Sequence, residues 1–191
     1  PLYSSAASDV YKRQRLGLGE HERLLVFAGR GSQEKHLPVL FDALRQLGSG
    51  YHLLLIGTGP QPDAPGNTTV FEDFLPAAEV AAWLASSDAL LHAGDQETFG
   101  LVALEAMASA IPVICADGGA LPEVVPEDCG LRVPPHDGVA MAAGALSTTS
   151  LFVRRWNSAA DAVTSWCCTV ISIMTTARHR PRREAGCAGG C

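Results

Sequence analysis

No uninterrupted apolar run in this 191-residue chain approaches the roughly 20 residues that a membrane-spanning helix requires. Positive charge is also scarce, because 14 Lys and Arg stand against 20 Asp and Glu, which leaves a net charge of -6. Proteins bind nucleic-acid phosphates through clustered Lys and Arg. The composition therefore predicts a soluble globular protein without a nucleic-acid partner, and it favours small-molecule chemistry.

The six cysteines lack the arrangement of a disulfide framework. Cys115 and Cys129 stand alone in the middle of the chain, and the other four crowd its last stretch. We interpret the two central cysteines as buried small residues of a cytoplasmic protein in a reducing compartment, rather than as redox or metal residues. The length predicts one sizeable domain.

The first 14 residues, PLYSSAASDVYKRQ, lack the apolar core of a signal peptide and the arginine-rich, acid-poor pattern of a transit peptide. Their last six residues are what GAT-GTG-TAT-AAG-AGA-CAG encodes, which is a transposon adapter of sequencing libraries. We therefore expect residues 1–14 to be an artefact of sequence assembly without a function.

Residues 146–191 lose the helical periodicity of the middle and carry two Trp, four Cys and a basic cluster over Arg178–Arg183. Two interpretations are open: a phosphate- or membrane-binding tail, or an out-of-frame translation that has replaced native C-terminal helices. We favour the frameshift and assign this segment no function. The functional domain is thus predicted to span residues 15–145.

Between these ends, short apolar β-rich runs alternate with amphipathic helical patterns, which is typical of βαβ units. The runs are almost continuously apolar, as expected for strands that helices cover on both faces. The pattern predicts an α/β domain with a doubly wound, Rossmann-like parallel sheet. The expected strands are Leu24–Ala28, His52–Ile56, Thr69–Phe71, Ala89–His92, Val113–Cys115 and Leu131–Val133, and the expected helices are Leu37–Leu47, Ala77–Ser86, Gly100–Ala110 and one from near Asp137.

Ligands of doubly wound sheets bind beyond the carboxyl ends of the strands, where loops lead into helices. Arg30 and Lys35 flank such a loop after the first expected strand. Arg offers a bidentate fork and Lys a point charge, a combination that suits a diphosphate. Taken alone, Arg and Lys near a surface loop are usually just solvated cations.

Glu97 and Glu105 lie on either side of Gly100, where a helix is expected to begin. Amide groups at a helix start lack intrahelical partners and bind anions, so the N–H groups of Phe99, Gly100 and Leu101 are candidate phosphate donors. Carboxylates accept the hydroxyl protons of sugars. Glu97 would then serve a sugar on one side, and Glu105, about 7–8 Å along the axis, a ribose on the other. The alternatives are a helix-capping Glu97 and a merely exposed Glu105.

The run HAGDQETFGLVALEAMASAIPVI, with its two glutamates, resembles the donor-binding signature of glycosyltransferase family 4, the group 1 glycosyl transferases. The family pattern runs Glu-x-Phe-Gly-x-x-x-x-Glu-Ala-Met-Ala. The segment FAGRGSQEKHLPVL resembles the family's first loop, and LLLIGTGP, VFEDFLPAAEVAAWLASSDALLHAG and GGALPEVV agree with the wider pattern. The resemblance covers nearly all of residues 15–145.

This resemblance implies the C-terminal, nucleotide-sugar-binding half of a retaining GT-B glycosyltransferase. By it, Glu97 contacts the donor sugar, Glu105 holds the ribose, and Arg30 and Lys35 neutralise the leaving diphosphate, so that neither metal nor cofactor is expected. The amides of Phe99, Gly100 and Leu101 would hold sugar and phosphate oxygens. The segment from Phe71 to Phe74 would border the base.

The implied reaction is transfer of a hexose, mannosyl or glucosyl by preference, from a GDP- or UDP-sugar to a glycan or glycolipid acceptor with retention of configuration. In this family the acceptor site and a catalytic histidine belong to an N-terminal domain that the chain lacks. We therefore expect this chain to be inactive by itself, and any peripheral membrane contact to need the missing domain. His92 is not the missing histidine, because a histidine at a strand end is more often packed than catalytic.

Two other functions remain open at this point. The sequence Gly57-Thr58-Gly59 after a strand weakly suggests a nicotinamide-dependent oxidoreductase, but Pro62 stands where the third glycine of that motif belongs. A nucleotide- or sugar-binding module without catalysis is the other alternative. The sequence also departs from the family at Ala110, where glycine is usual, so the helix end must close without the residue that most easily adopts a left-handed backbone.

Overall fold

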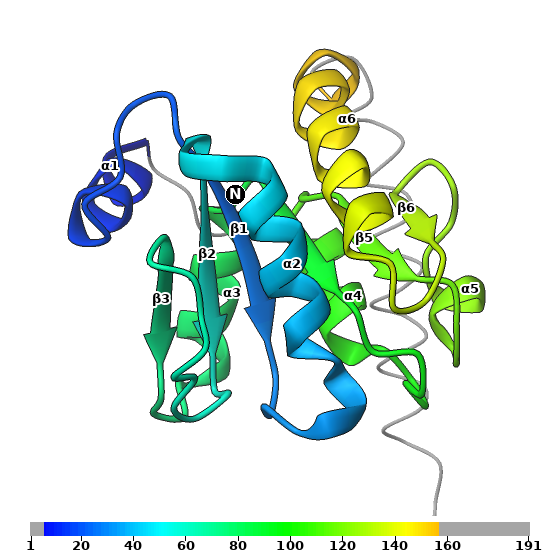
Figure 1. The fold of residues 1–191 in the computed structure, drawn as a ribbon. Helices are drawn as coiled ribbons and strands as arrows, with labels where there is room; N and C mark the ends of the chain where they lie inside the picture. The colour runs from blue at the N-terminus through cyan, green and yellow to red at the C-terminus, as the bar shows by residue number, and fades with distance from the viewer. Residues whose placement is uncertain (1–5, 157–191) are drawn as a thin grey trace, which may run out of the picture. The chain divides into compact units, whose positions relative to one another are not determined.

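The computed structural model describes residues 6–156 of the chain. Their six strands form one fully parallel sheet. Across the sheet the strands lie in the order β3-β2-β1-β4-β5-β6 (Figure 1). This order confirms the predicted doubly wound α/β fold. Each strand lies within one residue of its expected bounds: β1 (Arg23–Ala28), β2 (Tyr51–Ile56), β3 (Thr68–Phe71), β4 (Ala89–His92), β5 (Val113–Ala116) and β6 (Gly130–Val133).

Helices cover both faces of the sheet. Figure 1 shows α2 (Leu37–Leu47) and α6 (Gly138–Trp156) in front of it and α3 (Ala77–Ala85) and α4 (Leu101–Ala108) behind it. The remaining short elements are α1 (Ala6–Arg15), α5 (Leu121–Val124) and two 3-10 turns, η1 (Gln33–Lys35) and η2 (Gly48–Gly50). None of the helices in the described part of the chain has both the length and the apolar character needed to cross a bilayer.

Burial on both faces explains the continuous apolar runs. All four residues from Leu24 to Phe27 are fully buried. Leu25 and Phe27 pack with Leu40 and Leu44 of α2 into the core in front of the sheet, while Trp83 of α3 is buried behind it. Each such side chain contributes about 1.5–3 kcal/mol by burial. This core fixes the strand ends from which the functional loops emerge.

Helix α6 differs from expectation, because it continues past residue 145 to Trp156. Thr148 and Thr149 continue the buried face that Met141 and Ala145 begin. Threonine reads as polar in a periodicity count, yet Thr149 Oγ1 donates to the Ala145 carbonyl at 2.7 Å, and its methyl group can pack. The frameshift interpretation of the tail stays a prediction, and most of that tail lies outside the described residues.

Helix α1 covers the segment interpreted as an adapter. Lys12 Nζ donates to the Ala82 carbonyl of α3 at 2.8 Å, and Arg13 pairs with Asp88 at 3.4 Å. Contacts of this kind need only a helix with basic residues beside an acidic surface. The origin of residues 1–14 therefore stays a prediction.

The end of α4 shows how the chain manages without the usual glycine. Ala110 adopts a left-handed backbone, with φ of 63°. That conformation costs a residue with a side chain about 1–2 kcal/mol. The departure noticed in the sequence thus coincides with a strained position.

Replacing Ala110 by glycine should raise the free energy of unfolding. The relieved strain exceeds the extra chain entropy of glycine, which is roughly 0.4–1 kcal/mol, so we expect a gain of about 0.5–1 kcal/mol in urea denaturation. Ala108→Gly is the matched control, because this exposed residue is the last of α4 and has no left-handed backbone, so glycine there relieves no strain and should not stabilise the domain. A destabilised Ala110→Gly variant would contradict the strain argument.

Candidate functional site

A cavity of about 320 Å³ lies at the carboxyl edge of the sheet, behind β1 and β2. Its walls come from the loops after β1, β2 and β3 and from one side each of α3 and α4. The lining residues are Ala28, Gly29, Arg30, Ile56, Gly57, Phe74, Leu75, Ala77, Val80, Leu101, Val102 and Glu105. The cavity is mainly apolar, and its two charged residues have opposite sign.

Arg30 and Glu105 are those two charged residues. Within the described part of the chain, neither side chain makes a hydrogen bond or an ion pair, and both remain open to solvent. Desolvation against the apolar wall raises the pKa of the Glu105 carboxyl. The cavity therefore offers one uncommitted cation and one uncommitted acid to a ligand.

Lys35 and Glu97 meet outside this cavity. Lys35 Nζ lies 2.6 Å from Glu97 Oε2, and both side chains are largely buried. The same carboxylate oxygen lies 3.3 Å from Nε2 of His92, whose side chain is 1% exposed. The structure thus joins two predicted site residues, 62 positions apart in the sequence, to a histidine that the sequence indicated was merely packed.

The surroundings of Lys35, Glu97 and His92 set the charge states of the carboxylate and the imidazole. Desolvation raises the pKa of Glu97, but the hydrogen bond and the charge of Lys35 outweigh it and lower the pKa to about 2. Burial, and then the charge of Lys35, lower the pKa of His92. A lowered pKa keeps His92 mainly neutral at pH 7, with its Nε2 beside an ionised Glu97.

Helix α4 begins at Leu101, one residue after the predicted start at Gly100. Gly100 is the residue before the helix, with a left-handed φ of 69°, and a Cβ there would meet Leu121 at 3.2 Å. Phe99 and Leu101 are exposed on either side of it. The Gly100 backbone also hydrogen-bonds to Glu97, which contributes to the low pKa of that carboxyl. A ligand at this helix start would share the amide with Glu97.

The structure separates the two aromatic residues expected to border a base. Phe74 lines the cavity and is 93% exposed. Phe71 instead packs edge-on against Trp83, with ring centroids 5.2 Å apart, and lies beneath Arg15. Of the two, Phe74 is the one placed to contact a ligand in the cavity.

The loop after β5 supports the Glu97 loop, which the sequence alone did not reveal. Ala120 donates its N–H to the Glu97 carbonyl at 2.7 Å. A Cβ on Gly119 would lie 2.5 Å from the same carbonyl oxygen, and a Cβ on Gly118 would lie 2.9 Å from Asp95. The adjacent Gly118 and Gly119 are the sequence signal for this contact, because two backbones approach each other closely where side chains are absent.

The structure offers little to a dinucleotide cofactor at Gly57-Thr58-Gly59. After β2 the chain proceeds through turns to β3 without a helix, so no helix start faces that loop. Among the described residues, one group has the composition of a metal site, namely His36, Asp95 and His136, and none of the three lines the cavity.

The chain is similar in sequence to known glycosyl transferases. The family model for glycosyl transferases group 1 matches residues 22–150. The sulfoquinovosyl transferase SQD2 of Arabidopsis thaliana is 36% identical over 122 residues, which cover 61% of this chain and 24% of SQD2. A GDP-mannose-dependent alpha-(1-6)-phosphatidylinositol dimannoside mannosyltransferase of Mycobacterium tuberculosis is 39% identical over 116 residues, covering 56% of this chain and 30% of that enzyme. The chain therefore spans about a quarter to a third of these relatives.

Solved structures share the fold at lower identity. The C-terminal domain of the group 1 glycosyl transferase LpcC from Francisella tularensis has a TM-score of 0.64 at 21% identity, covering 81% of this chain and 88% of that domain. The Anabaena protein HepE, solved with UDP-glucose, has a TM-score of 0.68 at 19% identity, covering 92% of this chain and 54% of HepE.

Proposed function

The chain belongs to the group 1 glycosyl transferases, and we propose that it is the donor-binding domain of a retaining enzyme with a GT-B fold. The intact protein would transfer a hexose from a nucleoside-diphosphate sugar to a glycan or glycolipid acceptor. The observation that carries this proposal is the cavity in which Arg30 and Glu105 lie without partners.

The cavity suits the nucleotide part of such a donor. A ribose presents two neighbouring hydroxyls, which the free carboxylate of Glu105 can accept. Arg30 can hold a diphosphate with its bidentate fork. Leu75, Val80 and the exposed Phe74 provide an apolar surface for the flat base. Complementarity to the nucleotide therefore comes from three neighbouring loops and two helices.

Lys35 and Glu97 suit the sugar end. In this structure the two side chains form an ion pair, with Lys35 Nζ 2.6 Å from Glu97 Oε2. A sugar diphosphate can replace both halves of the pair, because its phosphate takes Lys35 and its hydroxyls take Glu97. Lys35 and Arg30 would then stabilise the charge that develops on the leaving diphosphate. This chemistry needs no metal ion at the phosphates.

The proposal also covers the identity of the donor and the separate roles of the two domains. We favour a mannosyl or glucosyl group on GDP or UDP, which agrees with the GDP-mannose dependence named for the mycobacterial relative and with the UDP-glucose bound by HepE. The acceptor site would lie on an N-terminal domain. By itself, this chain would bind the donor without transferring sugar, and a donor-hydrolysis assay that detects turnover by it would contradict that part.

Substituting Glu97 and Glu105 separately should distinguish binding of the sugar from binding of the nucleotide part of the donor. Glu105→Gln should weaken a sugar nucleotide and the free nucleoside diphosphate alike, each by roughly tenfold, because both contain the ribose and a charged hydrogen bond becomes a neutral one. Glu97→Gln should weaken only the sugar nucleotide. It also releases Lys35, so affinity for the nucleoside diphosphate should hold or rise. Calorimetric titration of each variant with GDP, UDP and their hexose conjugates measures both effects.

Glu127→Gln is the matched control, because this carboxylate is 90% exposed and lies outside the cavity. Melting temperatures of all variants separate lost binding from lost stability. Equal losses for both ligand types in Glu97→Gln would remove Glu97 from the sugar site. No loss in Glu105→Gln would remove the cavity from the nucleotide site.

A further inference from the structure

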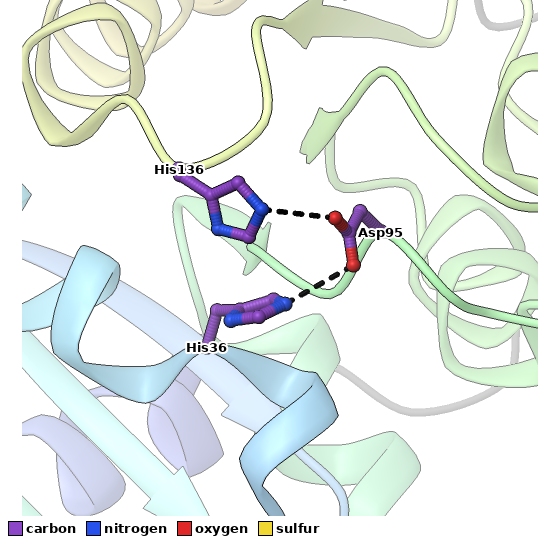
Figure 2. A group of neighbouring side chains, drawn as sticks. All are labelled: His36, Asp95 and His136. Carbon is purple, nitrogen blue, oxygen red and sulfur yellow. Dashed lines mark hydrogen bonds and ion pairs between the residues drawn. The ribbon is translucent and has the colours of Figure 1, made fainter.

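Two histidines and an aspartate from three separate loops meet at the carboxyl edge of the sheet (Figure 2). His36 lies directly before α2, Asp95 follows β4, and His136 precedes α6. Nε2 of His36 lies 3.1 Å from one carboxylate oxygen of Asp95, and Nε2 of His136 lies 3.0 Å from the other. The two imidazole rings meet edge to face, with centroids 4.3 Å apart.

These three groups have the chemistry of transition-metal ligands. Neutral imidazole and carboxylate bind Zn²⁺ and its neighbours, whereas Mg²⁺ and Ca²⁺ select oxygen ligands. Bonds of about 2.0–2.1 Å in a tetrahedral site place ligand atoms roughly 3.3–3.5 Å apart. One ligand atom from each residue already lies within 4.8 Å of the others. Small side-chain rotations would therefore close a three-ligand site, with water in the fourth position.

The backbone holds both histidines in an uncommon conformation. His36 has φ of 48° and His136 has φ of 60°, and in the described residues only one other non-glycine residue has positive φ. Left-handed backbone is unfavourable for histidine and persists where the surroundings over-determine it, often at ligand clamps. A hydrogen bond from His36 and a close contact from His136 to Asp95 alone give a weak reason for histidine at both positions.

We propose that His36, Asp95 and His136 form a site for a divalent transition metal of the Zn²⁺ type. The side chain of His136 is 56% exposed and that of Asp95 is 21% exposed, so an ion can enter from solvent. His36 follows Lys35 directly, and Asp95 lies two residues before Glu97. A bound ion would therefore link the two loops that carry the Lys35–Glu97 pair to the loop before α6. It would lie outside the cavity of Arg30 and Glu105, so its test does not require the donor to bind.

Titration of the whole chain with Co²⁺, a spectroscopic stand-in for Zn²⁺, tests the site. Cys167, Cys168, Cys187 and Cys191 are first replaced by serine, so that their thiols do not compete. We expect one ion per chain with ligand-field absorption and without sulfur-to-cobalt charge transfer. His136→Gln and Asp95→Asn should each weaken binding by more than about 10-fold, since even removing an outer partner of a metal ligand costs roughly 10–100-fold.

Two further variants make the result decisive. His21→Gln, at an exposed histidine outside the cluster, should bind Co²⁺ like the parent. The double variant His36→Gly/His136→Gly removes both ligands and relieves both strained residues. It should melt at a higher temperature than the metal-free parent and show no further rise with Zn²⁺. Binding of Co²⁺ that is absent from the parent, or unchanged in His136→Gln and Asp95→Asn, would overturn the proposal.

Discussion

Gly119→Ala is expected to lower the free energy of unfolding by about 2–5 kcal/mol. Gly119 has a left-handed φ of 57°, which an alanine adopts at a cost of about 1–2 kcal/mol. The new Cβ would also lie 2.5 Å from the Glu97 carbonyl oxygen and 2.7 Å from its nitrogen. Backbone atoms cannot rotate away as a side chain can, so overpacking adds roughly 1–3 kcal/mol. Urea denaturation measures the sum.

Gly59→Ala separates the two contributions. Gly59 has a similar φ of 71°, but nothing lies within 4 Å of the position of its Cβ. It should therefore lose only the backbone contribution of about 1–2 kcal/mol. Equal losses in the two variants would show that the loop after β5 does not support Glu97. A larger loss in Gly119→Ala, with weaker sugar-nucleotide binding in the molecules that remain folded, is the expected result.

Arg30→Ala should weaken binding of GDP or UDP by about 10- to 150-fold. This range corresponds to the roughly 1.5–3 kcal/mol of a hydrogen bond to a charged group. The guanidinium lines the cavity and has no hydrogen bond or ion pair in the described structure, so its removal should leave stability almost unchanged. Binding of the uncharged nucleoside should also change little. Calorimetry with nucleoside and nucleoside diphosphate measures the difference.

Arg45→Ala is the control for a general loss of positive charge. Arg45 is also exposed, but it pairs with Asp42 at 2.6 Å and lies outside the cavity. Its removal should leave both affinities unchanged. If Arg30→Ala binds the diphosphate as tightly as Arg45→Ala does, the loop after β1 is not the phosphate site.

The fold was predictable because its determinants are local. The four central strands, β2, β1, β4 and β5, are each built around a short apolar run, and the buried face of α2 repeats at helical spacing from Leu37 to Leu44. Strand bounds follow from where such runs stop. The continuation of α6 was missed because Thr148 and Thr149 are polar residues that the helix buries. The Thr149 hydroxyl is satisfied there by the Ala145 carbonyl and the Tyr51 hydroxyl.

The sequence predicted which loop or helix carries each residue of the candidate site, but not how these segments contact one another. The sequence placed Arg30 in the loop after the first expected strand and Glu105 in the helix expected to begin at Gly100, and the structure brings them to one cavity. It could not show that Lys35 pairs with Glu97, because side-chain direction depends on how two loops 62 residues apart fold. The cluster of His36, Asp95 and His136 had no sequence signal for the same reason, since a metal motif on one helix has fixed spacing and a site from three loops has none.

The strand order has a consequence for how such a domain can diversify. β1 and β4 are neighbours at the centre of the sheet, yet only two residue pairs join them, against six between β1 and β2. Their connections leave in opposite directions, because α2 packs on one face and α4 on the other. The crevice at this switch point is thus made by topology rather than by particular side chains. Substitutions in the loops around it can change which ligand the crevice accepts while the buried frame, and with it the stability of the domain, stays the same.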